Sequence, residues 1–165
     1  MRIRLFAIAV LTLTVAIGTA RSDESKVPLG DVPKAGLEAV KAMFPKADIT
    51  GAAKETDNDK TVYEVTLKQM GRTIDVTIGI DGKIQVVEKE IAEKDLPVEV
   101  RRALDAKYPK AIYKIVEQVE AVKDGKPTLD FFETLLVTAQ GESLEVQIAP
   151  DGKIKAEEKK QAGKE

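Results

Sequence analysis

The chain has 165 residues, of which 26 are basic and 28 acidic, and it contains no cysteine and no histidine. This composition excludes a disulfide framework, a thiolate or imidazole nucleophile, and the usual zinc ligands. The mild acidity also argues against phosphate contacts, so we expect no nucleic-acid partner.

Residues 1–20 have the pattern of a secretory signal peptide. Arg2 and Arg4 give a basic start, residues 5–17 are almost wholly apolar, and the segment ends in the small residues Gly18-Thr19-Ala20. We expect cleavage after Ala20, which takes the formal charge from −2 to −4. An uncleaved anchor is the alternative, but a spanning helix needs about 20 apolar residues. The sequence therefore predicts a periplasmic or secreted protein without stable membrane insertion.

A helix is expected from Pro33 to Phe44, because apolar residues recur there at helical spacing. Proline costs no hydrogen bond at the start of a helix, and Asp31 just before it is expected to cap the free amides. Phe44 precedes Pro45, which disfavours the helical region and predicts the end of the helix.

Four extended runs follow the predicted helix. The clearest runs from Arg72 to Ile80, where apolar residues alternate with polar ones at the period of a half-buried strand. Turn residues separate the runs at Asp57-Asn58-Asp59, Met70-Gly71 and Asp81-Gly82. The four runs lie near residues 48–55, 61–68, 72–80 and 83–90.

The second half of the chain repeats the first. The helix pattern returns 64 residues later between Pro97 and Tyr108, with Asp95 in the capping position, and Asp81-Gly82 returns 70 residues later as Asp151-Gly152. Extended runs lie near residues 112–122, 128–139, 143–149 and 153–159, and the six extra residues fall around 120–128.

The predicted fold class is α+β: a tandem repeat of one helix plus a four-stranded antiparallel sheet (αββββ twice), preceded by a signal peptide. We place repeat 1 at residues 27–92 and repeat 2 at 93–160, with frayed ends at 21–26 and 161–165, the latter a disordered tail. Each helix is expected to cover the apolar face of its sheet, and the two repeats are expected to dock.

These patterns resemble the PepSY-like family, also described as β-lactamase-inhibitor-like. The residues that carry the resemblance are Val32-Pro33, Phe44-Pro45-Lys46-Ala47, Thr61 to Val65, and Ile80 to Ile84, and it extends over about residues 30–160. The resemblance implies an exported bacterial protein, similar in fold to a tandem inhibitor that grips β-lactamases with the open face of its sheet. The disulfides of that inhibitor have no counterpart here, and no inhibitory residue is carried over.

One face of the predicted sheet collects polar side chains. A two-residue turn at Met70-Gly71 would pair residue 68 with 73, 66 with 75 and 64 with 77. An ordinary solvated face is the alternative, since antiparallel sheets commonly leave one side to water. The candidate binding face comprises Glu64, Thr66, Lys68, Thr73, Asp75 and Thr77, with Phe131 and Phe132 from repeat 2.

Phe131 and Phe132 are adjacent on a predicted strand, so they must point to opposite faces. We expect one ring in the core, where Tyr113 is also expected, and the other at the surface or an interface.

Two sharper interpretations compete with simpler ones. Asp57, Asn58, Asp59 and Glu64 offer oxygens for calcium, but they lack the spacing of a calcium loop, and a hairpin turn accounts for them better. Glu64 and Asp75 form a carboxylate pair, but on a flat face without a cleft. We therefore assign no catalytic, cofactor-binding or metal-ligating residue and expect no enzyme.

The sequence favours an exported, non-catalytic module that binds a protein or peptide through the open sheet face, with inhibition of a protease or another envelope enzyme as one form. The alternative is a periplasmic protein that binds a small ligand or cation.

Overall fold

The computed structural model describes residues 23–57 and 60–160. The expected signal peptide, the tail at 161–165, and Asn58 and Asp59 of the predicted turn lie outside the described residues. The elements, in chain order, are β1 (Asp23–Lys26), the 3-10 turn η1 (Leu29–Asp31), α1 (Lys34–Met43), β2 (Asp48–Asp57), β3 (Lys60–Gln69), β4 (Arg72–Gly79), β5 (Ile84–Glu90), η2 (Glu93–Asp95), α2 (Val98–Lys107), β6 (Ile112–Lys123), β7 (Lys126–Val137), β8 (Ser143–Ile148) and β9 (Ile154–Lys160).

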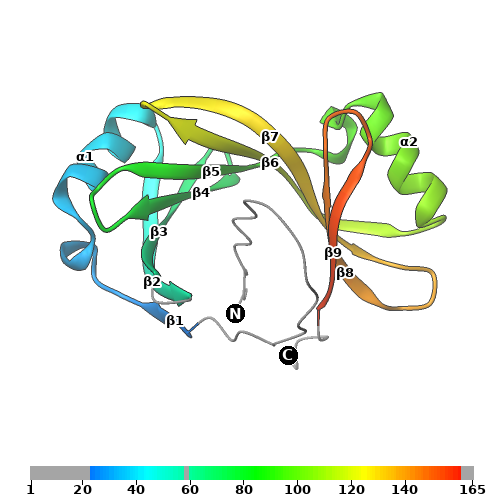
Figure 1. The fold of residues 1–165 in the computed structure, drawn as a ribbon, viewed down its shortest axis with the longest axis horizontal. Helices are drawn as coiled ribbons and strands as arrows, with labels where there is room; N and C mark the ends of the chain where they lie inside the picture. Colours follow the sequence, from blue (N-terminus) through cyan, green and yellow to red (C-terminus); the bar gives the residue numbers. More distant parts are fainter. Residues whose placement is uncertain (1–22, 58–59, 161–165) are drawn as a thin grey trace.

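The strands form one antiparallel sheet in which β1 to β9 are neighbours in chain order. Figure 1 shows the sheet as an arch with α1 and α2 on its outer, convex side. Each helix precedes four strands, and β5 pairs with β6, so the two halves share a continuous sheet. The architecture is α+β, as the sequence predicts, with nine strands and two helices in the described residues.

Strand β1 was not expected. Its residues Asp23–Lys26 were predicted to be a frayed end, but they pair with Thr56 to Ala53 of β2. This prediction was wrong because backbone groups at a sheet edge can pair with a strand whose side chains have no period-two pattern.

The starts of the helices also differ from the prediction. Asp31 and Asp95 do not cap α1 and α2; each ends a 3-10 turn, and the cap positions are held by Pro33 and Pro97 without a side-chain hydrogen bond. A proline before each helix sets a favourable φ, but the acidic residue lies two residues before the cap position, too early to reach the free amides.

The ends of the helices are as predicted. Phe44 and Tyr108 leave the helical region, with ψ of 63° and 65°, and their amides still donate to Val40 and Leu104. The following proline explains why both helices end here.

Each helix covers its own apolar core. Val40 of α1 packs on Val65 and Val76 of the first half, whereas Leu104 of α2 packs on Leu136 and Val146 of the second. A polar group separates the cores on the convex side: Lys89 Nζ donates to Glu120 at 2.7 Å, and Gln118 donates to the same carboxylate at 2.6 Å. The protein thus has two cores under one sheet.

The extra residues of the second half lengthen the β6–β7 hairpin. Its tip lies beside α1 in Figure 1, and Val122 packs against the core of the first half. The insertion therefore holds the two halves together.

The repeated Asp-Gly turns are hairpins packed against the helices. Asp81 and Asp151 each accept a hydrogen bond from the backbone amide two residues later, at 3.1 and 3.0 Å. Gly152 has φ +87°, and a Cβ there would lie 2.8 Å from the carbonyl oxygen of Glu99 in α2. The turn therefore needs glycine both for its backbone and for its contact with the helix.

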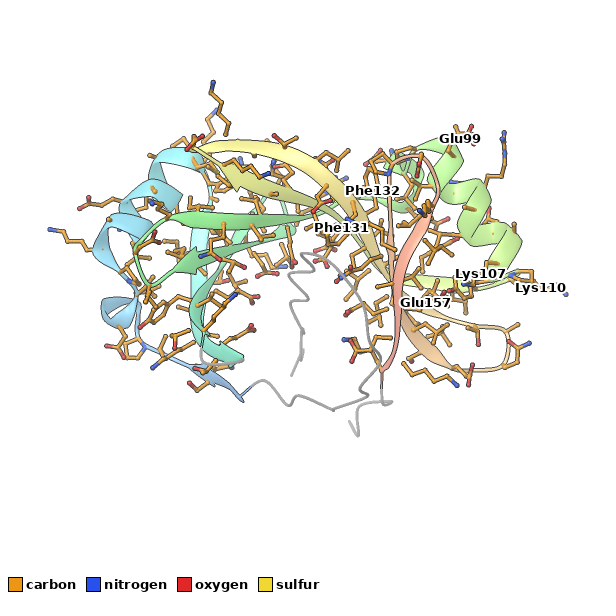
Figure 2. The ribbon with its side chains drawn as sticks, viewed as in Figure 1. Glu99, Lys107, Lys110, Phe131, Phe132 and Glu157 are labelled. Atoms are coloured by element: carbon orange, nitrogen blue, oxygen red, sulfur yellow. The ribbon has the colours of Figure 1, made fainter. Side chains whose placement is uncertain are left out.

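The end of α2 is also linked to the edge strand β9. Tyr108 donates to Glu157 at 2.5 Å, and Lys107 forms an ion pair with the same carboxylate. The bonds from Lys107 and then Tyr108 hold the pKa of Glu157 below its ordinary value. Burial, followed by the bond to Glu157, raises the pKa of Tyr108 above its usual range. Figure 2 shows Lys107 and Glu157 together at this end of the molecule.

We predict that Leu104→Ala lowers the free energy of unfolding by about 2–5 kcal/mol, because this fully buried side chain would leave a cavity. Chemical denaturation measures the change. Val98→Ala on the same helix is the control: this residue is 68% exposed and its loss should change stability by less than about 0.5 kcal/mol. Equal effects would contradict the packing of α2.

Gly152→Ala is predicted to destabilise the protein more than Gly141→Ala. Both glycines have positive φ, so each alanine costs about 1 kcal/mol of backbone strain, but no atom lies within 4 Å of a Cβ at Gly141. The clash with Glu99 should add about 1–3 kcal/mol at Gly152 only. Thermal unfolding of the two variants compares them directly, and equal losses would show that the helix contact is unimportant.

Candidate binding face

The sheet face opposite the helices, here called the concave face, carries the six polar residues predicted on β3 and β4. The register is the predicted one: Lys68 pairs with Thr73, Thr66 with Asp75, and Glu64 with Thr77. The alternate residues of both strands lie in the first core. The Met70-Gly71 turn sets this register, since both residues adopt positive φ as a two-residue hairpin requires.

The exposure of this face differs from the prediction. Thr73, Asp75 and Thr77 are buried, at 2–4% exposed, whereas the sequence suggested a flat and solvated face. Glu64 and Thr66 are half-buried and Lys68 is exposed. The curvature of the sheet contributes to this difference, because side chains on the inner side of an arch are brought closer together than on a flat sheet.

A row of carboxylates crosses the centre of the concave face. Asp75 pairs with Glu88 between β4 and β5, while Glu117 of β6 is flanked by Glu90 of β5 and Glu133 of β7. Carboxylate oxygens of Asp75, Glu88 and Glu117 lie within 4.8 Å of one another. We call these five residues, Asp75, Glu88, Glu90, Glu117 and Glu133, the carboxylate row.

Sequence reasoning found only Asp75 of this row. The other four become neighbours through the pairing of β5 with β6 and of β6 with β7, which joins residues far apart in the chain. The signal that could have found them is the alternation of Glu88 and Glu90 on one strand, which places both on one face.

Neighbouring polar groups bond to the row. The backbone amide of Thr73 donates to Glu90 at 3.1 Å, and the side-chain amide of Gln147 donates to Glu133 at 3.0 Å. The buried hydroxyl of Thr77, two residues from Asp75 on the same strand face, has no hydrogen-bond partner among the described residues.

At the far end of the face, Lys160 of β9 joins two further carboxylates. Its Nζ lies 3.0 Å from Glu145 and 2.9 Å from Glu158, residues that pair directly across β8 and β9. Burial opposes the charge of Lys160, but the bond to Glu158 and the nearby charge of Glu145 outweigh it and raise its pKa.

The structure separates the two phenylalanines of β7. Phe132 is 3% exposed and lies in the second core, whereas Phe131 is half-buried on the concave side. Lys155 lies over the Phe131 ring at 4.6 Å and pairs with Asp130 at 2.8 Å. Figure 2 marks both rings on β7. Tyr113 packs against the second core, as expected, and donates to Asp105 at 2.8 Å.

The two sharper interpretations of the sequence gain no geometric support. Asp57 pairs with Lys60 as the ends of β2 and β3, which agrees with a hairpin turn at this loop. Glu64 and Asp75 lie on successive rungs of the ladder, opposite Thr77 and Thr66 rather than each other.

A pocket of about 460 Å³ lies elsewhere, between the end of α2 and residues 138–140. Lys107 and Lys110 border it, but Lys107 is already paired with Glu157. This pocket contains none of the predicted site residues.

Comparison with known proteins identifies the fold. No protein-family model matches the chain, and no curated protein matches it. Among solved structures, a DUF2874 family protein from Bacteroides uniformis aligns with a TM-score of 0.61 at 19% identity, covering 77% of this chain and 88% of that one.

Two further structures share the fold. A BLIP-like protein from Bacteroides fragilis aligns with a TM-score of 0.58 at 20% identity, covering 79% of this chain and 88% of that one. A candidate periplasmic protein from Bacteroides eggerthii aligns with a TM-score of 0.62 at 17% identity, covering 78% of this chain and 88% of that one. The chain therefore has a BLIP-like fold; the narrower resemblance to PepSY-like proteins stays an expectation from the sequence.

We predict that Lys160→Met lowers the free energy of unfolding by about 1–2 kcal/mol, because Glu145 and Glu158 would face each other without the cation between them. Lys159→Met is the control on the opposite face of β9, where the pair with Glu142 is exposed and contributes less than about 0.5 kcal/mol. Urea denaturation at neutral pH checks both variants. If Lys160→Met lowered the free energy of unfolding less than Lys159→Met does, the placement of Lys160 between Glu145 and Glu158 would be contradicted.

Proposed function

We propose that the protein is an exported, non-catalytic module, built as two PepSY-like repeats, that binds a protein or peptide through the concave face of its sheet. Inhibition of an envelope enzyme is one example of such a binding function. The residues that contact the partner would come from the predicted face on β3 and β4, the carboxylate row and Phe131.

The observation that carries the proposal is the like-charged register of the concave face. Glu117 lies between Glu90 and Glu133, and Asp75 lies opposite Glu88, so acidic side chains from four strands gather on this face. A face that gathers charge of one sign offers electrostatic complementarity to a partner, which contributes to specificity and to the rate of association.

Phe131 gives the same face an apolar contact. Its ring lies beside the polar strands rather than in the core, and aromatic residues are enriched among the side chains that anchor protein interfaces. A face that combines charge with a half-buried aromatic ring is typical of a protein-binding surface.

Export is supported by the signal-peptide pattern of residues 1–20. It is also supported by the Bacteroides eggerthii protein of the same fold, which is a candidate periplasmic protein. In residues 23–57 and 60–160, no helix is long and apolar enough to cross a membrane. A non-catalytic role is supported by the lack of histidine and cysteine, the commonest bases and nucleophiles.

Cation binding is the second candidate. It is favoured by the three carboxylates of Asp75, Glu88 and Glu117, whose oxygens lie within 4.8 Å of one another. Calcium prefers oxygen ligands of this kind but takes six to eight of them. Calorimetry with calcium chloride discriminates this candidate from partner binding.

We predict that Phe131→Ser weakens partner capture by about 2 kcal/mol or more while leaving the melting temperature nearly unchanged, since a half-buried ring outside the core contributes to binding but little to folding. Crosslinking in the cell envelope followed by mass spectrometry identifies the partner, and titration with that partner measures the loss.

Phe132→Ser is the matched control, because this neighbouring ring is buried in the second core and its loss should lower stability by about 3–5 kcal/mol. If Phe131→Ser unfolds the protein as Phe132→Ser does, or leaves capture unchanged, Phe131 is not an anchor of the binding face.

A further inference from the structure

We infer that Met70 is a reversible oxidation site, where a peroxide adds one oxygen to the thioether sulfur and a methionine sulfoxide reductase removes it while the protein stays folded. Such a site goes beyond the proposed binding function and is independent of it. Three observations support it: the exposure of Met70, the turn that holds it, and the protected position of Met43.

The chain has few sulfur atoms that an oxidant can attack. It contains no cysteine, so the sulfur is confined to three methionines, Met1, Met43 and Met70. Met1 belongs to the expected signal peptide and lies outside the described residues. Oxidation of sulfur in the described residues therefore concerns two thioethers, and their surroundings decide which one reacts.

The two thioethers have opposite surroundings. The Met70 side chain is 93% exposed, more than any other large hydrophobic side chain in residues 23–57 and 60–160. Met43 ends α1, is half-buried and packs against the first core. A peroxide dissolved in water must contact the sulfur to transfer its oxygen, so Met70 reacts first.

The β3–β4 turn accounts for the exposure of Met70 but not for the choice of methionine. Met70 and Gly71 have φ of 51° and 79°, which places them in a two-residue hairpin turn beyond the ends of both strands. Asp124 and Gly125 form a turn of the same kind between β6 and β7, with φ of 51° and 72°, and there the first position holds the aspartate that such turns favour. The turn at Met70 thus presents a thioether to solvent where the backbone alone would favour a short polar side chain.

The reaction is a two-electron oxidation of the sulfur by hydrogen peroxide. A sulfur lone pair attacks one peroxide oxygen, an S–O bond forms and the O–O bond breaks. The proton of the transferred oxygen goes to the departing hydroxide, which leaves as water, so the thioether becomes a sulfoxide as the peroxide is reduced.

The fold tolerates the added oxygen at Met70 but not at Met43. Met70 belongs to neither apolar core, so its sulfoxide is hydrated and disturbs no buried contact. A sulfoxide at Met43 would bring a polar oxygen against the first core. Oxidation of Met70 therefore changes the polarity of the surface close to the Lys68–Thr73 end of the candidate binding face while the fold persists.

The test treats the purified protein with hydrogen peroxide and follows oxygen uptake by mass spectrometry. Peptide mapping assigns each added oxygen to one methionine, so Met1, where it is present, is measured separately. Met70 should oxidise at least about tenfold faster than Met43, because its sulfur is open to solvent. Equal rates, or a faster reaction at Met43, would overturn the inference.

Two variants and an unfolded sample are the controls. Met70→Leu should remove the fast reaction and Met43→Leu should keep it, and leucine conserves the volume of methionine in both. In concentrated guanidinium chloride the two sulfurs should react within about twofold of each other, because the fold no longer distinguishes them. A fast reaction that persists in Met70→Leu, or a preference for Met70 that persists in the unfolded chain, would overturn the inference.

Thermal unfolding and enzymatic reduction test the remaining parts. Protein oxidised at Met70 alone should melt within about 2 °C of the untreated protein, since exposed sites contribute little to stability. The two epimer-specific methionine sulfoxide reductases together should restore the original mass of the folded protein. A larger loss of melting temperature, or a sulfoxide that is reduced only after unfolding, would overturn the inference. No partner enters these measurements, so their failure leaves the proposed function standing.

Discussion

The pairing of β5 with β6 is the interaction on which the rest of the structure depends. It joins the end of the first half to the second half, so that eight strands from two similar units and the short β1 become one sheet. The same pairing sets Glu88 opposite Val119 and Glu90 opposite Glu117. A slip of one residue would turn the side chains of one half to the other face and would dissolve the carboxylate row.

The stability that supports this row comes from the other side of the sheet. Val65, Val76, Leu136 and Val146 are fully buried beneath the helices, and burial of such side chains contributes about 1.5–3 kcal/mol each. Like-charged cross-strand pairs cost less, of the order of 0.2–1 kcal/mol each. The apolar convex side therefore supplies much of the stability of the sheet, and the two faces of the same strands are free to have different roles.

Local features of the sequence predicted much of the fold. The prolines after Phe44 and Tyr108 predicted where the helices end, and periodicity predicted the strands. The turn residues Met70-Gly71 predicted the register of the hairpin around them. Each of these signals lies within a few residues of the feature that it predicts. The capping roles of Asp31 and Asp95 were wrong because each residue ends a 3-10 turn and lies two residues before the cap position, which composition does not reveal.

Only the part of the candidate site that depends on neighbouring residues in the chain was predicted. The six polar residues of β3 and β4 follow from one hairpin, and the opposed directions of Phe131 and Phe132 follow from strand geometry. Glu117 and Glu133 belong to a hairpin of their own, and their approach to Asp75 needs the register between halves. Long-range register of this kind has no signature in a short stretch of sequence.

The polar group of Lys89, Gln118 and Glu120 between the two cores has a consequence for how the protein loses its structure. Because the described residues form two separate apolar cores, the cores are coupled through the hydrogen bonds of β5 and β6 and through the contact of Val122 with the first core. Substitutions in one core should then be additive with those in the other, as for distant sites. The molecule resembles two adjoining cooperative units, and amide exchange in each would report its own opening rather than a common one.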